Sequence, residues 1–196
     1  MSMTVMCVAP DGAWAVATAD RRTTCKVAGE VVSRTDGEPK QLRFPGGLLV
    51  CCGDRRHGDA IRESVQQRQP QRLGELQAAI RGALDGVHAT GYVSEHPGVC
   101  VIAAAVWDAI DERFRGWLFD PITGTPSPAP SVIALPELDQ SDQHRIEQFI
   151  ESRRHAGRLD VTVAAIRRAF AVVRERSDAV SAEYDLVSED AHARIN

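Results

Sequence analysis

Two short apolar runs on either side of a turn open the chain and constrain its fold more than any other feature. Residues 5–9 and 14–19 are almost wholly apolar, and Pro10-Asp11-Gly12 lies between them. This pattern is typical of a β-hairpin whose strands are covered on both faces. If the hairpin folds about Gly12, residues whose numbers sum to about 24 lie opposite each other, and Thr4 faces Asp20.

The rest of the chain alternates blocks of strands with pairs of helices. Strands are expected over 24–33, 40–44, 48–52, 99–107, 113–119, 131–135 and 180–187, and helices after Gly58, over 73–87, from Ser141 and from about Asp160. Strands with two apolar faces need cover above and below, so each helix pair is expected to cover one of two stacked sheets. We therefore expect an α+β fold, a four-layer αββα sandwich. The chain length suits a single domain over residues 1–196.

Charge and composition exclude several classes of function. The formal net charge is −4 and no long run of like charges occurs, which argues against a nucleic-acid partner. The longest apolar stretch, 99–107, is far shorter than the roughly 20 residues of a membrane helix, and no signal-peptide pattern is present. A cytoplasmic location without membrane contact is expected. The cysteines lack Cys-x-x-Cys spacing, so no disulfide framework, metal or cofactor is expected.

Lysine is scarce, and its two positions are informative. Of 23 Lys and Arg residues, only Lys26 and Lys40 are lysine. A guanidinium cannot give up its proton, so a retained lysine is expected where a compact amine is needed. N-terminal-nucleophile enzymes need such a group beside a chain-initial Thr, Ser or Cys, whose own α-amine is the base. Thr4, Lys40 and Asp20 are the residue types that this chemistry requires.

Seven short motifs follow one another over nearly the whole chain. They are Thr4-Val-Met-Cys-Val, Asp11-Gly12, Ala17-Thr-Ala-Asp20-Arg-Arg, Lys40-Gln-Leu-Arg-Phe, Cys51-Cys52-Gly53, Gly58-Asp-Ala-Ile and Asp178-Ala-Val-Ser181. In this order they resemble the motifs of proteasome β subunits and the related bacterial ring peptidases, which are N-terminal-nucleophile hydrolases. The resemblance implies a threonine-type peptidase that cleaves unfolded polypeptides.

The resemblance also implies a role for each residue of the site. Thr4 is expected to attack the scissile carbonyl, Lys40 to tune the Thr4 hydroxyl and Asp20 to orient Lys40. The backbone N–H of Gly53 is expected to stabilise the oxyanion, which needs close backbone approach rather than a side chain.

Two further residues and the partners follow from the same resemblance. Asp178 and Ser181 are expected to brace the amine and hydroxyl of Thr4. Self-association into rings is implied, with the active sites facing an enclosed chamber and an ATP-driven unfoldase supplying the substrate.

Several features depart from the family pattern. Met1-Ser2-Met3 precedes Thr4, so a free amine requires removal of three residues, or translation from Met3 followed by methionine trimming. The interval between Asp20 and Lys40 is longer than in the family, which leaves Lys26 as a rival. The family's Gly-Ser-Gly is replaced by residues 135–141. A register shifted by one residue puts Met3 at the nucleophile position and makes the subunit inert.

Two alternative functions follow from these departures. The first is a catalytically inactive structural or scaffold subunit, which the changed segment 135–141 and the blocked Thr4 favour. The second is an amidohydrolase of the same fold that acts on a small amide, with Cys7 as the nucleophile. That alternative requires Cys7 to be exposed at a mature N-terminus.

Overall fold

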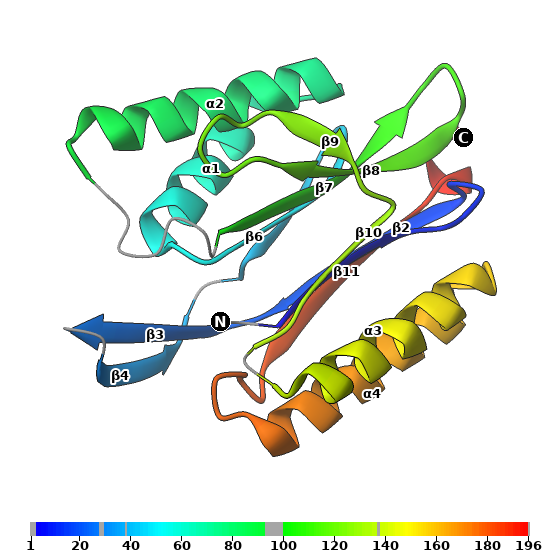
Figure 1. Ribbon diagram of the computed structural model, residues 1–196. Coiled ribbons are helices and arrows are strands. Elements are labelled where there is room, and N and C mark those ends of the chain that lie inside the picture. Colours follow the sequence, from blue (N-terminus) through cyan, green and yellow to red (C-terminus); the bar gives the residue numbers. More distant parts are fainter. Residues whose placement is uncertain (1–2, 28–29, 38, 93–99, 137, 196) are drawn as a thin grey trace.

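The structure, a computed structural model, describes residues 3–27, 30–37, 39–92, 100–136 and 138–195 (Figure 1). The strands are β1 (Thr4–Val8), β2 (Trp14–Asp20), β3 (Arg22–Val27), β4 (Glu30–Asp36), β5 (Gln41–Phe44), β6 (Gly47–Cys52), β7 (Val101–Asp108), β8 (Arg113–Phe119), β9 (Pro126–Pro128), β10 (Ser131–Ala134) and β11 (Tyr184–Asp190). The helices are α1 (Arg55–Arg68), α2 (Leu73–Ala89), α3 (Gln140–His155), α4 (Leu159–Arg176) and the short α5 (His192–Ile195).

The strands form two main antiparallel sheets and a separate ribbon. The four-stranded sheet has the order β10-β1-β2-β11, and the five-stranded sheet has the order β5-β6-β7-β8-β9. The ribbon β3-β4 lies at one end of the molecule (Figure 1). Helices α1 and α2 cover the five-stranded sheet, and α3 and α4 cover the four-stranded sheet (Figure 1).

Three clusters of buried side chains hold these elements together. Val5, Val16, Ile166 and Phe170 belong to the cluster between the four-stranded sheet and its helices. Leu49, Ile61, Leu76 and Ile102 belong to the cluster between the five-stranded sheet and its helices. Met6, Val8, Leu48 and Val50 belong to the cluster between the two sheets. Alternate residues of β1 thus face the helices and the second sheet, as the period of a strand dictates.

The first hairpin forms where the sequence predicts it, but its register is shifted by one residue. The turn is closed by hydrogen bonds from Ala9 N to Trp14 O and from Gly12 N to Ala9 O, both 2.9 Å, with Gly12 in the left-handed region at φ 78°. Paired residues sum to 23, so Thr4 lies opposite Ala19. The predicted pairing of Thr4 with Asp20 is therefore wrong.

The predicted α+β class is confirmed, and both main sheets are antiparallel, while several element boundaries need correction. The strand expected over 24–33 is two strands, β3 and β4, so six strands precede the first helix instead of five. The last strand starts at Tyr184 instead of 180. Helix α3 starts at Gln140, one residue before the expected Ser141, and the Asp139 carboxylate caps it by accepting the N–H groups of Ser141 and Asp142. Residue 99, which was expected in a strand, lies outside the described residues.

Candidate functional site

The charged centre of the predicted site is a buried ion pair between Asp20 and Lys40. The Asp20 side chain is 0% exposed and the Lys40 side chain 12%, and Lys40 Nζ lies 3.5 Å from Asp20 Oδ1. The same carboxylate oxygen accepts the backbone N–H of Arg22 at 2.7 Å. Lys40 Nζ also donates to the carbonyl of Arg22 at 2.6 Å. The structure therefore brings together two of the predicted residues, at the end of β2 and next to the first residue of β5.

The residue held against this ion pair is Met3. Met3 N donates to Asp20 Oδ2 at 2.7 Å, and Asp20 N donates to the Met3 carbonyl at 3.1 Å. The Met3 side chain is fully buried in the core cluster beneath α3 and α4. Asp20 therefore accepts a hydrogen bond from the Met3 N–H and donates one to the Met3 carbonyl. Met3 thus occupies the position that a register shifted by one residue assigns to the nucleophile.

Thr4 is buried with its hydroxyl directed at the other sheet. Thr4 is 0% exposed, and Thr4 Oγ1 donates to Cys52 Sγ at 2.6 Å. Its backbone lies between Ala19 of β2 and Ala134 of β10. In the described part of the chain, no hydrogen bond joins the Thr4 side chain to Asp20. Thr4 of β1 therefore lies against Cys52 at the end of β6, and Cys52 directly precedes Gly53, the predicted oxyanion residue.

Gly53 follows directly after Cys52, at the end of β6 and before α1. Its φ is 112°, in a region that glycine adopts readily and that residues with a Cβ rarely enter. The next residue, Asp54, caps α1 by accepting the N–H groups of Arg56 and His57. Backbone conformation alone accounts for a glycine at this position, and the predicted role of its N–H stays a prediction.

Asp178 and Ser181 lie in the loop before β11, and Arg22 joins this loop to the ion pair. The Asp178 carboxylate, 75% exposed, pairs with Arg34, and its carbonyl accepts Arg22 Nη1 at 2.8 Å. Ser181 is 2% exposed and accepts the N–H of Glu183 at 3.0 Å. In the ranges that the structure describes, neither side chain hydrogen bonds to Thr4.

A second acid, Asp36 on β4, belongs to the same network. Hydrogen bonds from Arg22 and then from Ser181 lower the pKa of Asp36 below its usual value, although burial acts weakly in the opposite direction. Arg22 is thus in contact with Asp20, Lys40, Asp36 and Asp178 through side-chain or backbone atoms. Arg22 lies in the motif of residues 17–22, but the sequence predicted no role for it.

The alternative nucleophile and the rival lysine are placed differently. Cys7 is fully buried, and burial, followed by the charge of Glu151, raises the pKa of its thiol to about 12. A thiol with such a pKa is protonated at neutral pH and is a poor nucleophile. Lys26 lies on β3, and its side chain is outside the described part of the structure.

The structural role of Met3 was not predicted, although the apolar alternation of the first nine residues indicates it. Met3, Val5, Cys7 and Ala9 are apolar at every second position and all pack beneath α3 and α4. The apolar alternation of β1 therefore starts at Met3, one residue before the predicted start of the functional segment. A period-two reading of the first nine residues identifies Met3 as a core residue.

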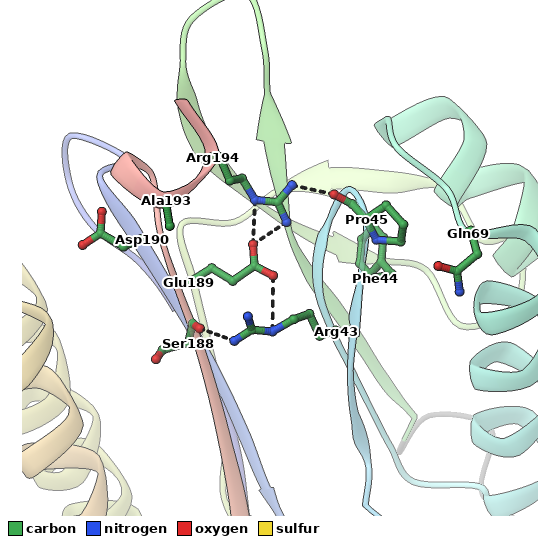
Figure 2. A pocket seen from close by; sticks show the side chains of 9 residues that line it. All are labelled: Arg43, Phe44, Pro45, Gln69, Ser188, Glu189, Asp190, Ala193 and Arg194. Carbon is green, nitrogen blue, oxygen red and sulfur yellow. Dashed lines mark hydrogen bonds and ion pairs between the residues drawn. The ribbon is translucent and has the colours of Figure 1, made fainter. Parts of the chain in front are cut away.

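A groove of about 610 Å³ is lined by residues at the C-terminal end of β11 (Figure 2), whereas Tyr184, at the start of β11, pairs with Asp20. Glu189, which is 9% exposed, bridges two arginines in it. The Glu189 carboxylate accepts Arg194 Nε at 2.7 Å and lies 3.5 Å from Arg43 Nε. Each charge in this group has an opposite charge beside it, so the group joins α5 and β11 to β5.

Among the described residues, no cluster of three or more His, Cys, Asp or Glu side chains is arranged to hold a metal ion. Within the same ranges, no helix combines the length and the apolar character that crossing a bilayer demands.

Comparison with solved structures identifies a shared fold. An Anbu Gly-1 mutant from Hyphomicrobium sp. strain MC1 superimposes with a TM-score of 0.70 at 14% identity, covering 97% of this chain and 83% of that one. Anbu, described as an ancestral β-subunit, from Yersinia bercovieri gives 0.68 at 13% identity, with coverage of 96% and 81%. A helical assembly of the Anbu complex from Pseudomonas aeruginosa gives 0.67 at 14%, with the same coverage.

These comparisons correct the predicted family. No protein-family model and no curated protein matches the sequence. The three solved structures compared above are Anbu proteins, which are a family distinct from the proteasome β subunits that the motifs resemble. The fold is proteasome-like, and the assignment to proteasome β subunits is wrong. Short motifs such as Asp-Gly or Cys-Cys-Gly occur too widely to separate families that share a fold.

Proposed function

We propose that the chain is a self-associating subunit with a four-layer αββα sandwich, in one domain over residues 1–196, and that it is a threonine-type peptidase. The buried ion pair between Asp20 and Lys40 carries this proposal. A buried ion pair adds little to stability, because desolvation of both charges offsets their attraction. A carboxylate and an ammonium brought together beside the start of β1 are the groups that an N-terminal-nucleophile reaction requires, which supports a chemical role.

In this proposal the described chain is a precursor, and Thr4 becomes the nucleophile once residues 1–3 are removed. Cleavage of the peptide bond before Thr4 removes the Met3 N–H from Asp20 Oδ2 and creates an α-amine close to the carboxylate. The Thr4 hydroxyl, which donates to Cys52 in the uncleaved chain, is then proposed to interact with Lys40 as well. The amine, with a pKa near the ordinary value of about 8, is suited to accept the hydroxyl proton.

The subsequent reaction is acyl transfer. Thr4 Oγ1 attacks the peptide carbonyl, the amine takes the hydroxyl proton and passes it to the leaving amine, and the acyl group remains on Oγ1 as an ester. The Lys40 ammonium lowers the proton affinity of the hydroxyl, and Asp20 holds Lys40. The N–H of Gly53 is proposed to stabilise the oxyanion, and Asp178 and Ser181 are proposed to brace the amine.

Self-association is proposed on the basis of proteins that share the fold. One Anbu structure is described as a helical assembly, which supports self-association for this chain and leaves the type of assembly to measurement. Unfolded polypeptide as the substrate, an ATP-driven unfoldase as the supplier and the cytoplasm as the location stay predictions.

A peptide epoxyketone tests the nucleophile directly. Its ketone reacts with a hydroxyl and its epoxide with a free amine, so a stable ring forms only on an N-terminal Thr or Ser. We expect an adduct on the peptide that begins at Thr4, its loss in Lys40→Ala and its retention in Lys26→Ala. An adduct on a peptide that begins at Ser2 would mean that Ser2, and not Thr4, is the nucleophile, while the reaction class would be unchanged. Assembled protein that stays unlabelled would overturn the proposal.

A second candidate function, an inactive scaffold subunit, is favoured by one observation. Met3 is fully buried in the core and occupies the position opposite Asp20, so its removal exposes core surface. A scaffold needs no free amine and keeps Met3 in place. Native particles that retain Met3, assemble and remain unlabelled by the epoxyketone would establish this alternative.

A further inference from the structure

Gln41, the first residue of β5, has a buried side-chain amide without a hydrogen-bond partner. Gln41 is 6% exposed, and neither Nε2 nor Oε1 is paired with any group in the described ranges. Most buried polar side chains in proteins are paired with protein groups or with ordered water, because an unpaired buried amide is costly. The unpaired amide therefore indicates that a ligand or a water molecule hydrogen bonds to the Gln41 side chain.

The register places Gln41 beside the candidate nucleophile. Gln41 lies opposite Val50 on β6, and directly opposed residues of antiparallel strands project to the same face. Val50 and Cys52 both pack between the two sheets, so Gln41 and Cys52 are diagonal neighbours on that face. Cys52 accepts the Thr4 hydroxyl. The register therefore puts the Gln41 side chain on the face that also holds the contact between Thr4 and Cys52, one diagonal step from Cys52.

The facing sheet contributes mainly small side chains to the space between the sheets. Strands β11 and β2 face β5 across that space, β11 with Val187 and β2 with Ala15, Ala17 and Ala19. A buried polar group beside such small side chains is a typical site for ordered water.

We propose that ordered water binds the Gln41 carboxamide between the sheets, and that Gln41 is a positioning residue that holds one water molecule beside Thr4 Oγ1. This role rests on the proposed peptidase activity. In the acyl-enzyme, the water donates one hydrogen bond to Gln41 Oε1 and faces the ester carbon. Its oxygen forms a bond to that carbon while its other proton passes to the Thr4 amine. The bond between the acyl carbon and Oγ1 breaks, Oγ1 takes the proton from the amine, and the carboxylic acid leaves.

A high-resolution crystal structure of the protein tests the water site. We expect a water molecule within about 2.7–3.2 Å of Gln41 Oε1 or Nε2, on the side of Thr4. A carboxamide bonded to protein atoms alone, or in contact with apolar groups only, would overturn the site whether or not the protein is a peptidase.

Turnover of a short peptide nitrophenyl ester tests the role of the water. Wild-type protein is expected to release nitrophenol continuously. Gln41→Leu is expected to release about one equivalent and then turn over about 100-fold more slowly, with the acyl mass on the Thr4 peptide. Gln66→Leu, a change on the exposed face of α1, is the matched control and should behave as wild type.

The outcomes separate this inference from the proposed function. Equal turnover in wild type and Gln41→Leu overturns the positioning role while the peptidase stands. A wild-type protein that releases no nitrophenol overturns the proposed function and, with it, the role of Gln41. In that case the crystal structure still decides whether water is bound at the carboxamide.

Discussion

The backbone N–H of Met3 donates to the buried carboxylate of Asp20 at 2.7 Å, and the Asp20 N–H donates back to the Met3 carbonyl. This pairing fixes the register of β1 against β2 and determines which residue lies against the Asp20–Lys40 ion pair. In the described chain that residue is Met3, and its side chain belongs to the core. The activity of Thr4 therefore depends on whether Met3 is removed.

Substitution of Met3 tests its place in the core. Met3→Ala is expected to lower the free energy of unfolding by about 2–5 kcal/mol, because it deletes buried methylene groups and leaves a cavity. Met3→Leu, which conserves volume, should cost less than about 1.5 kcal/mol. Urea denaturation of the full chain measures both. Equal stability of Met3→Ala and wild type would contradict the observed burial.

The ion pair is expected to behave as a coupled unit. Asp20→Asn or Lys40→Met leaves one buried charge without its partner, which costs about 3–5 kcal/mol in the free energy of unfolding. The double variant should cost less than the sum of the two single changes, because no charge then remains unpaired. Denaturant unfolding of all three variants completes the cycle.

The exposed pair between Arg158 and Asp160 is the control for this cycle. Their side chains are 69% and 67% exposed, so its removal should change stability little. Additive costs for Asp20 and Lys40 would mean that the two side chains do not interact in solution.

The Cys7 thiol is expected to resist alkylation and to make the protein sensitive to alkaline pH. Burial raises its pKa to about 12 from an ordinary value of 9.0. The stability that this raised pKa contributes is complete below pH 9 and is lost as the pH rises toward 12, because the unfolded thiol ionises first. Stability should fall by up to about 1.4 kcal/mol per pH unit for this group.

Two measurements check the behaviour of Cys7. Cys7→Ala should show a shallower loss of stability between pH 9 and 11 in urea denaturation, whatever its stability at pH 7. Iodoacetamide at pH 8 should label Cys7 only after unfolding, as peptide mapping can show. Rapid labelling of Cys7 in the folded protein would revive the alternative of a cysteine nucleophile.

Two glycines are expected to respond to alanine in opposite directions. Gly47 has φ 147°, and a Cβ there would lie 2.0 Å from the Ala105 carbonyl oxygen. Gly47→Ala should therefore destabilise the β5–β6 hairpin by more than about 1 kcal/mol. Gly86 lies on the exposed side of α2, with nothing within 4 Å of its Cβ position. Gly86→Ala should stabilise the protein by about 0.4–1 kcal/mol, as measured by thermal unfolding.

The sequence predicted the fold better than the site, for a physical reason. Apolar runs and Gly/Pro turns report which segments form strands, and those of β1, β2, β7 and β8 were located correctly to within two residues. The register of a hairpin depends instead on the number of residues in its turn, and here one residue changes the partner of Asp20 from Thr4 to Met3. A shift of one residue also exchanges the two faces of a strand.

Long-range contacts account for what the sequence could not predict. The meeting of Lys40 with Asp20 was anticipated from residue type, and the structure has it at 3.5 Å. The contact between Thr4 and Cys52 spans 48 positions and two sheets, and no local pattern encodes it. The unpaired amide of Gln41 results from the packing of one sheet against the other, which no local pattern encodes.

The intact mass of the native assembled protein tests the central claim most directly, because a threonine nucleophile requires the free amine that removal of residues 1–3 creates. The account predicts a chain that begins at Thr4, together with an epoxyketone adduct on that residue. An assembled protein whose mass still includes Met3 would contradict it.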